Sequence, residues 1–149
     1  MPYPHTDEPI TAENPITSAV VRARPTPTYG TFGSFSVLAR TQIAASPSAV
    51  LSVIRDTKNW AKWNSFCPSL VISPKSPPAK ESSDAGIPKG EEGWLELGTI
   101  AELDVFMSGD GLIPGAKRSR TQGIIITVLE AILPTAENDN KSGYRIAWK

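Results

Sequence analysis

The sequence predicts an α+β fold with an antiparallel sheet, and two observations carry this prediction. Helical signals are confined to residues 46–66, where they follow an early strand pattern. From residue 69 onward the chain shows strand patterns separated by turn-forming residues. Helices that precede a run of strands are typical of α+β proteins with antiparallel sheets.

The N-terminal part is rich in Pro, Thr and Gly, and we interpret residues 1–33 as a flexible, extended arm. Within it, TSAVVRA (17–23) could pair as a strand. We expect one domain over residues 34–149, beginning with FSVLARTQIAA (35–45). Apolar or small residues alternate along most of that segment, which predicts a half-buried strand.

Two helices are predicted after this strand. Ser46 is placed as an N-cap and Pro47 as the first helical residue, where its missing N–H removes no helical hydrogen bond. An apolar stripe at helical spacing follows, formed by Val50, Leu51, Val53 and Ile54. A second short helix or helical turn begins near Asn59 and ends before Pro68.

The rest of the chain predicts strands and loops. PSLVIS (68–73) is a short strand, and residues 74–93 form a long polar loop. We expect this loop to be disordered, because it is too rich in Pro, Ser and Gly to pack. Further strands are expected within residues 94–109, 119–133 and 144–149, and three successive isoleucines at 124–126 indicate burial on both sides.

Composition excludes several classes of partner. The 15 basic and 15 acidic residues cancel, so no broad charge is present to bind nucleic acid or an anionic membrane. No apolar run approaches the roughly 20 residues of a membrane span, and the N-terminus carries no secretory pattern. The single cysteine, Cys67, fits a reducing compartment. We therefore expect a cytoplasmic protein.

The segment TQIAASPSAVLSVIRDTKNWAKWNSFCP (41–68) resembles the opening of START-like, helix-grip domains of the SRPBCC superfamily. That group includes polyketide cyclase/dehydrase-like proteins, coenzyme Q-binding proteins and lipid-transfer domains. The matching residues are Ala44, Ala45, Pro47, Ala49, Val50, Asp56, Trp60, Trp63, Asn64 and Phe66. Later segments agree more loosely, so that the resemblance covers residues 35–149. It implies a curved antiparallel sheet that grips a long C-terminal helix, with an apolar cavity between them.

The sequence departs from the family where it stops, at Lys149, inside a strand pattern. Family members continue with further strands and the long C-terminal helix, so the resemblance implies an incomplete domain with an open sheet face. We expect a truncated sequence. The alternatives are that a partner supplies the missing wall, or that the N-terminal arm folds over it. If the chain is naturally this short, a homo-oligomer is possible.

Apolar and aromatic residues supply the candidate ligand pocket. Trp60, Trp63 and Phe66 share one side of a helical turn, where they either pack the turn onto the sheet or line a cavity mouth. Two strand faces could line the cavity itself, or could equally be plain core. These faces carry Leu103, Val105, Tyr144, Ile146 and Trp148.

No catalytic residue, metal site or cofactor is predicted. One cysteine and one histidine, His5, cannot build a metal site of the usual kind. SGDGLIPG (108–115) lacks the lysine and the strand–helix context of a phosphate-binding loop. The leading hypothesis is binding of a hydrophobic small molecule, such as a lipid, polyketide or isoprenoid, between sheet and helix. The alternatives are a polyketide cyclase or dehydratase-like enzyme, and a protein-interaction module that uses the open sheet face.

Overall fold

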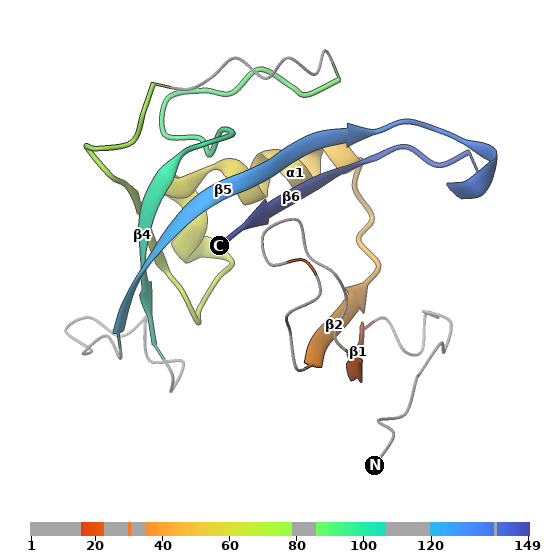
Figure 1. Ribbon diagram of the computed structural model, residues 1–149, viewed down its shortest axis with the longest axis horizontal. Helices are drawn as coiled ribbons and strands as arrows, with labels where there is room; N and C mark the ends of the chain where they lie inside the picture. The colour runs from red at the N-terminus through yellow and green to blue at the C-terminus, as the bar shows by residue number, and fades with distance from the viewer. Residues whose placement is uncertain (1–15, 23–29, 31–34, 79–85, 107–119, 139) are drawn as a thin grey trace. The chain divides into compact units, whose positions relative to one another are not determined.

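The computed structural model describes residues 16–22, 30, 35–78, 86–106, 120–138 and 140–149 (Figure 1). The chain divides into two compact units, Met1–Ala45 and Ser46–Lys149. Each unit holds its own sheet, of two strands in the first and four in the second.

The first unit is an antiparallel strand pair. Strand β1 (Ile16–Arg22) pairs with β2 (Phe35–Thr41) along its whole length, from Ile16 opposite Thr41 to Arg22 opposite Phe35. Residues 16–22, which we had assigned to the flexible arm, are therefore a strand; the rest of that arm, apart from Gly30, lies outside the described residues.

The burial of β2 and the unit it belongs to differ from the expectation. We expected residues 35–45 to open the domain that begins at residue 34, whereas β2 belongs to the two-stranded sheet and to the first unit. Its described side chains, among them Val37, are exposed rather than half-buried. Alternating apolar residues indicate a strand, but they do not identify its partner.

The second unit confirms the α+β class with an antiparallel sheet. Its strand order is β3-β4-β5-β6, with β3 at Ser69–Ile72, β4 at Ile100–Val105, β5 at Arg120–Ile132 and β6 at Gly143–Trp148. The long strand β5 is shared between two neighbours. Its residues 120–125 pair with β4, and its residues 126–132 lie beside β6. Figure 1 shows this long strand joining the two pairings.

Strand β5 carries a β-bulge at Thr127. Ile126 pairs with Trp148 and Val128 with the next residue back, Ala147, so Thr127 is the extra residue. The buried positions accordingly change from even numbers, Ile124 and Ile126, to an odd number, Leu129. Ile125 is half-buried, as the prediction of burial on both sides of this strand requires.

Two consecutive helices precede the sheet, as predicted. Helix α1 (Pro47–Arg55) begins with Pro47, and the Ser46 side chain accepts a hydrogen bond from the Ala49 N–H at 3.2 Å. The 3₁₀ helix η1 (Thr57–Lys62) follows at once, and Asp56 caps it by accepting from the Lys58 N–H at 3.1 Å. A second 3₁₀ turn, η3 (Ala136–Asn138), lies between β5 and β6.

One apolar core joins the helices to one face of the sheet. Leu51 of α1 and Trp60 of η1 pack with buried residues of β3, β4 and β5. Along β4 the buried side chains alternate with more exposed ones, as the sequence predicts. No helix among the described residues is long and apolar enough to cross a membrane.

Candidate ligand pocket

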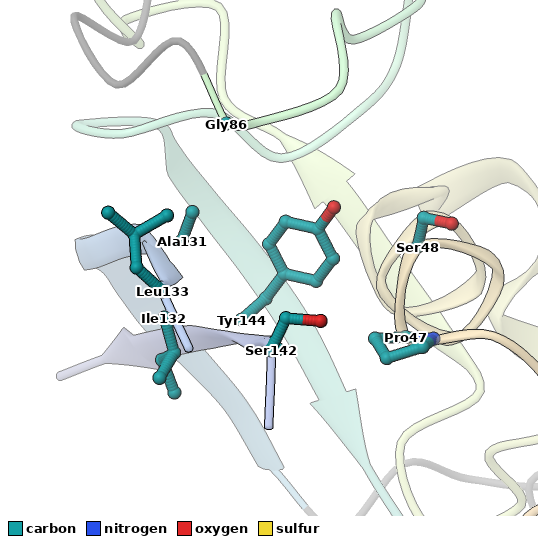
Figure 2. A pocket seen from close by; sticks show the side chains of 9 residues that line it. Pro47, Ser48, Gly86, Ala131, Ile132, Leu133, Ser142 and Tyr144 are labelled. Carbon is teal, nitrogen blue, oxygen red and sulfur yellow. The ribbon is translucent and has the colours of Figure 1, made fainter. Parts of the chain in front are cut away.

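A cavity of about 280 Å³ opens where the first turn of α1 faces the β5–β6 hairpin (Figure 2). Its lining comes from Pro47 and Ser48 of α1, residues 131–133 at the end of β5, residues 142–144 at the start of β6, and Gly86. Three separate regions of the chain, the start of α1, Gly86 and the β5–β6 hairpin, therefore form its wall. The volume is near the lower end of the roughly 300–1,000 Å³ typical of small-molecule sites.

The wall is mostly apolar, with three hydroxyl-bearing side chains. Ala131, Ile132, Leu133 and Pro47 give hydrocarbon surface, whereas Ser48, Ser142 and Tyr144 each add a hydroxyl. None of the nine lining residues, all of which the structure describes, carries a charge. Such a wall accepts a largely apolar molecule and can orient it through a few hydrogen bonds.

Tyr144 is the predicted ligand residue that lines this cavity. Its backbone is fixed by the ladder, where it pairs with Ala131 of β5. Its ring is partly buried and packs against the core. Figure 2 shows the ring between the β5 residues and Ser48, with the hydroxyl at its free end.

The other predicted ligand residues are not gathered at this cavity. Leu103 and Val105 are buried in the core, and Ile146 packs against it half-buried, as the core interpretation of these strand faces implies. Trp148, at the end of β6, is largely exposed.

The aromatic cluster of η1 and the residues that follow it divides into one buried and two exposed rings. Trp60 is 3% exposed, and its indole N–H donates to the Ile54 carbonyl oxygen at 3.0 Å. Trp63 and Phe66 are 46% and 49% exposed. The Trp63 ring is tilted by 60° against Trp60, with centroids 5.1 Å apart. Trp60 therefore fixes η1 to the sheet, while Trp63 and Phe66 present apolar surface to solvent.

A second cavity, of about 300 Å³, is polar. Acidic side chains and hydroxyls share its wall with Ile72, Pro77, Gly90, Gly93 and Trp94. The polar side chains are those of Glu91, Glu92, Glu96, Ser73, Ser76 and Thr99. All three hydroxyls already accept backbone N–H groups, Ser73 from Lys75 at 3.3 Å, Ser76 from Ile100 at 3.0 Å and Thr99 from Glu96 at 2.9 Å. No group of three His, Cys, Asp or Glu side chains suited to a metal ion occurs among the described residues.

Arg55, which the sequence did not mark, organises the segment beside this polar cavity. Its side chain is fully buried and forms an ion pair with Glu96. Its Nε donates to the Leu95 carbonyl oxygen at 2.9 Å and one terminal nitrogen to that of Pro88 at 2.7 Å. The guanidinium also lies 5.1 Å from the centre of the Trp94 ring.

These bonds hold part of the loop of residues 74–93, which we expected to be disordered. Residues 79–85 lie outside the described residues, but residues 86–93 are placed and bound to the helices. Besides the contact of Pro88 with Arg55, the Gly93 carbonyl oxygen accepts from the Thr57 hydroxyl at 2.7 Å, and Ile87 packs against the core. A buried guanidinium supplies the partners that polar loop backbone otherwise takes from water.

Asn64 and Cys67 lie in the turn that follows η1. The Asn64 side chain accepts from the Cys67 N–H at 2.8 Å and so bonds the backbone of its own turn. Burial raises the pKa of the Cys67 thiol above its ordinary value of 9.0. A thiol with a raised pKa is a weak nucleophile at neutral pH, which agrees with a packing role.

Comparison with known proteins identifies one relative by sequence. Over 122 residues the chain is 28% identical to "Oxopyrrolidines biosynthesis cluster protein O" from Penicillium oxalicum. The match covers 82% of this chain and 52% of that protein, so the chain spans about half the length of the curated relative. No protein-family model and no solved structure matches the chain.

Proposed function

We propose that this chain is a START-like, helix-grip type of domain that binds a hydrophobic small molecule, such as a lipid, polyketide or isoprenoid. The observation that carries the proposal is the uncharged cavity between the first turn of α1 and the β5–β6 hairpin. Hydrocarbon walls with a few hydroxyls suit an apolar ligand that needs orientation. The succession of two short helices and antiparallel strands also fits the motif that resembles this superfamily.

The name of the relative also supports the proposed binding of a small molecule. Its name assigns it to a biosynthesis cluster for oxopyrrolidines. Proteins of such clusters handle small organic molecules, and a cavity of about 280 Å³ accommodates a small one. The ligand of this chain would then be a biosynthetic intermediate or product small enough to fit this cavity.

The test places a bulky side chain in the cavity. Ser48→Phe and Ser142→Phe add rings from opposite walls, and Ser65→Phe adds the same ring at an exposed position beside Trp63 and Phe66. Native mass spectrometry and tryptophan fluorescence would follow binding of dodecanoate, farnesol and 2-acetylnaphthalene. We expect both cavity variants to weaken binding at least about tenfold, since a filled pocket loses most of its apolar contact, while Ser65→Phe leaves it unchanged.

Two outcomes would contradict the proposal. If the unaltered protein binds none of the three probes, the chain is not a receptor for this class of molecule. If Ser65→Phe weakens binding and the cavity variants do not, the ligand lies at Trp63 and Phe66 instead. Unfolding in urea would verify that each variant is folded.

We propose as the alternative a cyclase or dehydratase acting on a polyketide-like substrate, which a relative named for a biosynthesis cluster also accommodates. Holding a reactive chain in a folded geometry can accelerate ring closure without a dedicated acid or base. Metabolite profiles of a deletion strain would distinguish the two functions. Accumulation of an uncyclised precursor supports the enzyme, whereas an unchanged set of structures at altered amounts supports a binding protein.

A further inference from the structure

Among the three side-chain hydroxyls of the cavity wall, that of Tyr144 belongs to a residue fixed in the strand ladder and has no hydrogen-bond partner in the described part of the chain. The strand ladder and the core hold the residue, as described above. Among the parts of the chain that the structure describes, no hydrogen bond involves its phenolic oxygen. A tyrosine hydroxyl that lines a cavity and bonds no protein group is available to a ligand.

The two serines of the wall are less suited to this role. The Ser48 hydroxyl already shares a hydrogen bond of 3.1 Å with the Ser46 hydroxyl, at the start of α1. Ser142 belongs to the exposed connection before β6. Neither serine hydroxyl is therefore both held by the strand ladder and without a protein partner, as that of Tyr144 is.

The nine lining residues carry no charge, and this narrows the chemical class of the ligand. A carboxylate or ammonium group would lose part of its hydration in this cavity without gaining an opposite charge, which is unfavourable. A neutral carbonyl oxygen loses much less hydration and can accept the phenolic proton. A pure hydrocarbon would leave the phenol without a partner once the ligand excludes water.

From these features we infer that Tyr144 determines specificity by donating a hydrogen bond to a neutral carbonyl oxygen of the ligand. The ligand class is then a small, largely apolar ketone, aldehyde, ester or amide. This inference rests on the proposed function, because it assigns the recognition group of the same cavity. Tyr144 acts here in binding and orientation, and no chemical step is assigned to it.

A matched pair of probes tests the inference directly. 2-Acetylnaphthalene and 2-isopropylnaphthalene have nearly the same shape, but only the first carries a carbonyl oxygen. We expect the unaltered protein to bind the ketone about three- to tenfold more tightly, which corresponds to one neutral hydrogen bond. In Tyr144→Phe this preference should vanish through weaker ketone binding, while the affinity for the hydrocarbon stays the same. 2-Naphthoate should bind more weakly than the ketone.

A second measurement separates the hydrogen bond from a structural effect of the variant. Accepting a hydrogen bond lowers the carbonyl stretching frequency of a ketone. The infrared band of bound 2-acetylnaphthalene should therefore lie lower in the unaltered protein than in Tyr144→Phe. The unchanged hydrocarbon affinity shows in the same experiment that the cavity of the variant is intact.

The results that overturn the inference differ from those that overturn the proposed function. Equal binding of both naphthalenes, with Tyr144→Phe unchanged, refutes the role of Tyr144 and leaves a hydrophobic binding protein. Loss of the preference in Ser142→Ala instead of Tyr144→Phe assigns it to the other hydroxyl. Tightest binding of 2-naphthoate refutes the neutral ligand class. Failure of the unaltered protein to bind any of the probes, dodecanoate and farnesol included, refutes the proposed function itself.

Discussion

Arg55 and Glu96 form an ion pair although 41 residues separate them along the chain, and the arginine side chain is 0% exposed and that of the glutamate 14%. The pair joins the end of α1 to the segment that leads into β4. Leu95 completes the junction, since its N–H donates back to the Arg55 carbonyl oxygen at 2.8 Å.

Arg55→Met should destabilise the protein strongly. The change removes the charge partner of a largely buried carboxylate and leaves two carbonyl oxygens, those of Leu95 and Pro88, without their donor. Breaking a buried pair by removing one partner costs about 3–5 kcal/mol. Urea unfolding followed by far-ultraviolet circular dichroism measures this loss.

A matched control is available on the sheet. Arg145 and Glu130 also form an ion pair, at 2.9 Å, but their side chains are 58% and 45% exposed. Solvent screens such a pair, so Arg145→Met should cost no more than about 1 kcal/mol. Equal losses in the two variants would show that burial does not distinguish these ion pairs.

Gly93→Ala should destabilise the same junction through the backbone. Gly93 has a φ of +87°, a conformation that costs a residue with a side chain about 1–2 kcal/mol. The new methyl group would also approach Cε of Lys58 to 2.8 Å, although that flexible side chain can move. Gly123→Ala in β5 is the control, because its φ is not positive and its methyl group meets no atom within 4 Å. We expect it to be neutral or slightly stabilising in thermal unfolding, and a larger loss there than at Gly93 would refute this account.

Trp60→Phe and Trp63→Phe should separate the roles of two neighbouring rings. Trp60→Phe leaves the Ile54 carbonyl oxygen without its donor and removes part of a buried ring, with an expected cost of about 2–3 kcal/mol. Trp63→Phe keeps an aromatic ring at a half-exposed position and should change stability by less than about 0.5 kcal/mol. Chemical unfolding measures both, and the reverse order of losses would contradict the assignment of Trp60 as the packed ring.

The Cys67 thiol should make stability fall at alkaline pH. Burial raises its pKa in the folded state above the ordinary 9.0, so the unfolded chain loses this proton first as the pH rises. The stabilising contribution of the thiol is therefore complete below the ordinary pKa and declines through the alkaline range. Comparing Cys67→Ala with the unaltered protein at about pH 7 and about pH 10 isolates the effect, since other groups cancel. The variant should gain relative stability at the higher pH, and a constant difference would rule the effect out.

Local patterns predicted much of the fold. The cap at Ser46, the helix start at Pro47 and the strand between Pro68 and Ser73 all depend on residues a few positions apart. Such features are set by side-chain chemistry and period, which a sequence displays directly.

Features that depend on distant segments were not predictable in the same way. Arg55 at the end of a helix has the pattern of a solvent-exposed base, and only the folded loop shows that Pro88, Leu95 and Glu96 surround it. The pairing of β2 with β1 and the assembly of the cavity from α1, β5, β6 and Gly86 have the same origin. Tyr144, which the sequence analysis named as a pocket candidate on an apolar strand face, does line the cavity. The separation of Trp60 from Trp63 required the burial of each ring.

The bulge at Thr127 has a consequence for how this chain tolerates changes in length. Elsewhere in a paired strand, loss of one residue turns every following side chain to the opposite face. Deletion of Thr127 removes the extra residue instead, and it would leave Leu129 two positions after Ile126, with the spacing of a regular strand. The middle of β5, between its partners β4 and β6, is therefore where this sheet can lose a residue and still keep its hydrophobic side toward the core.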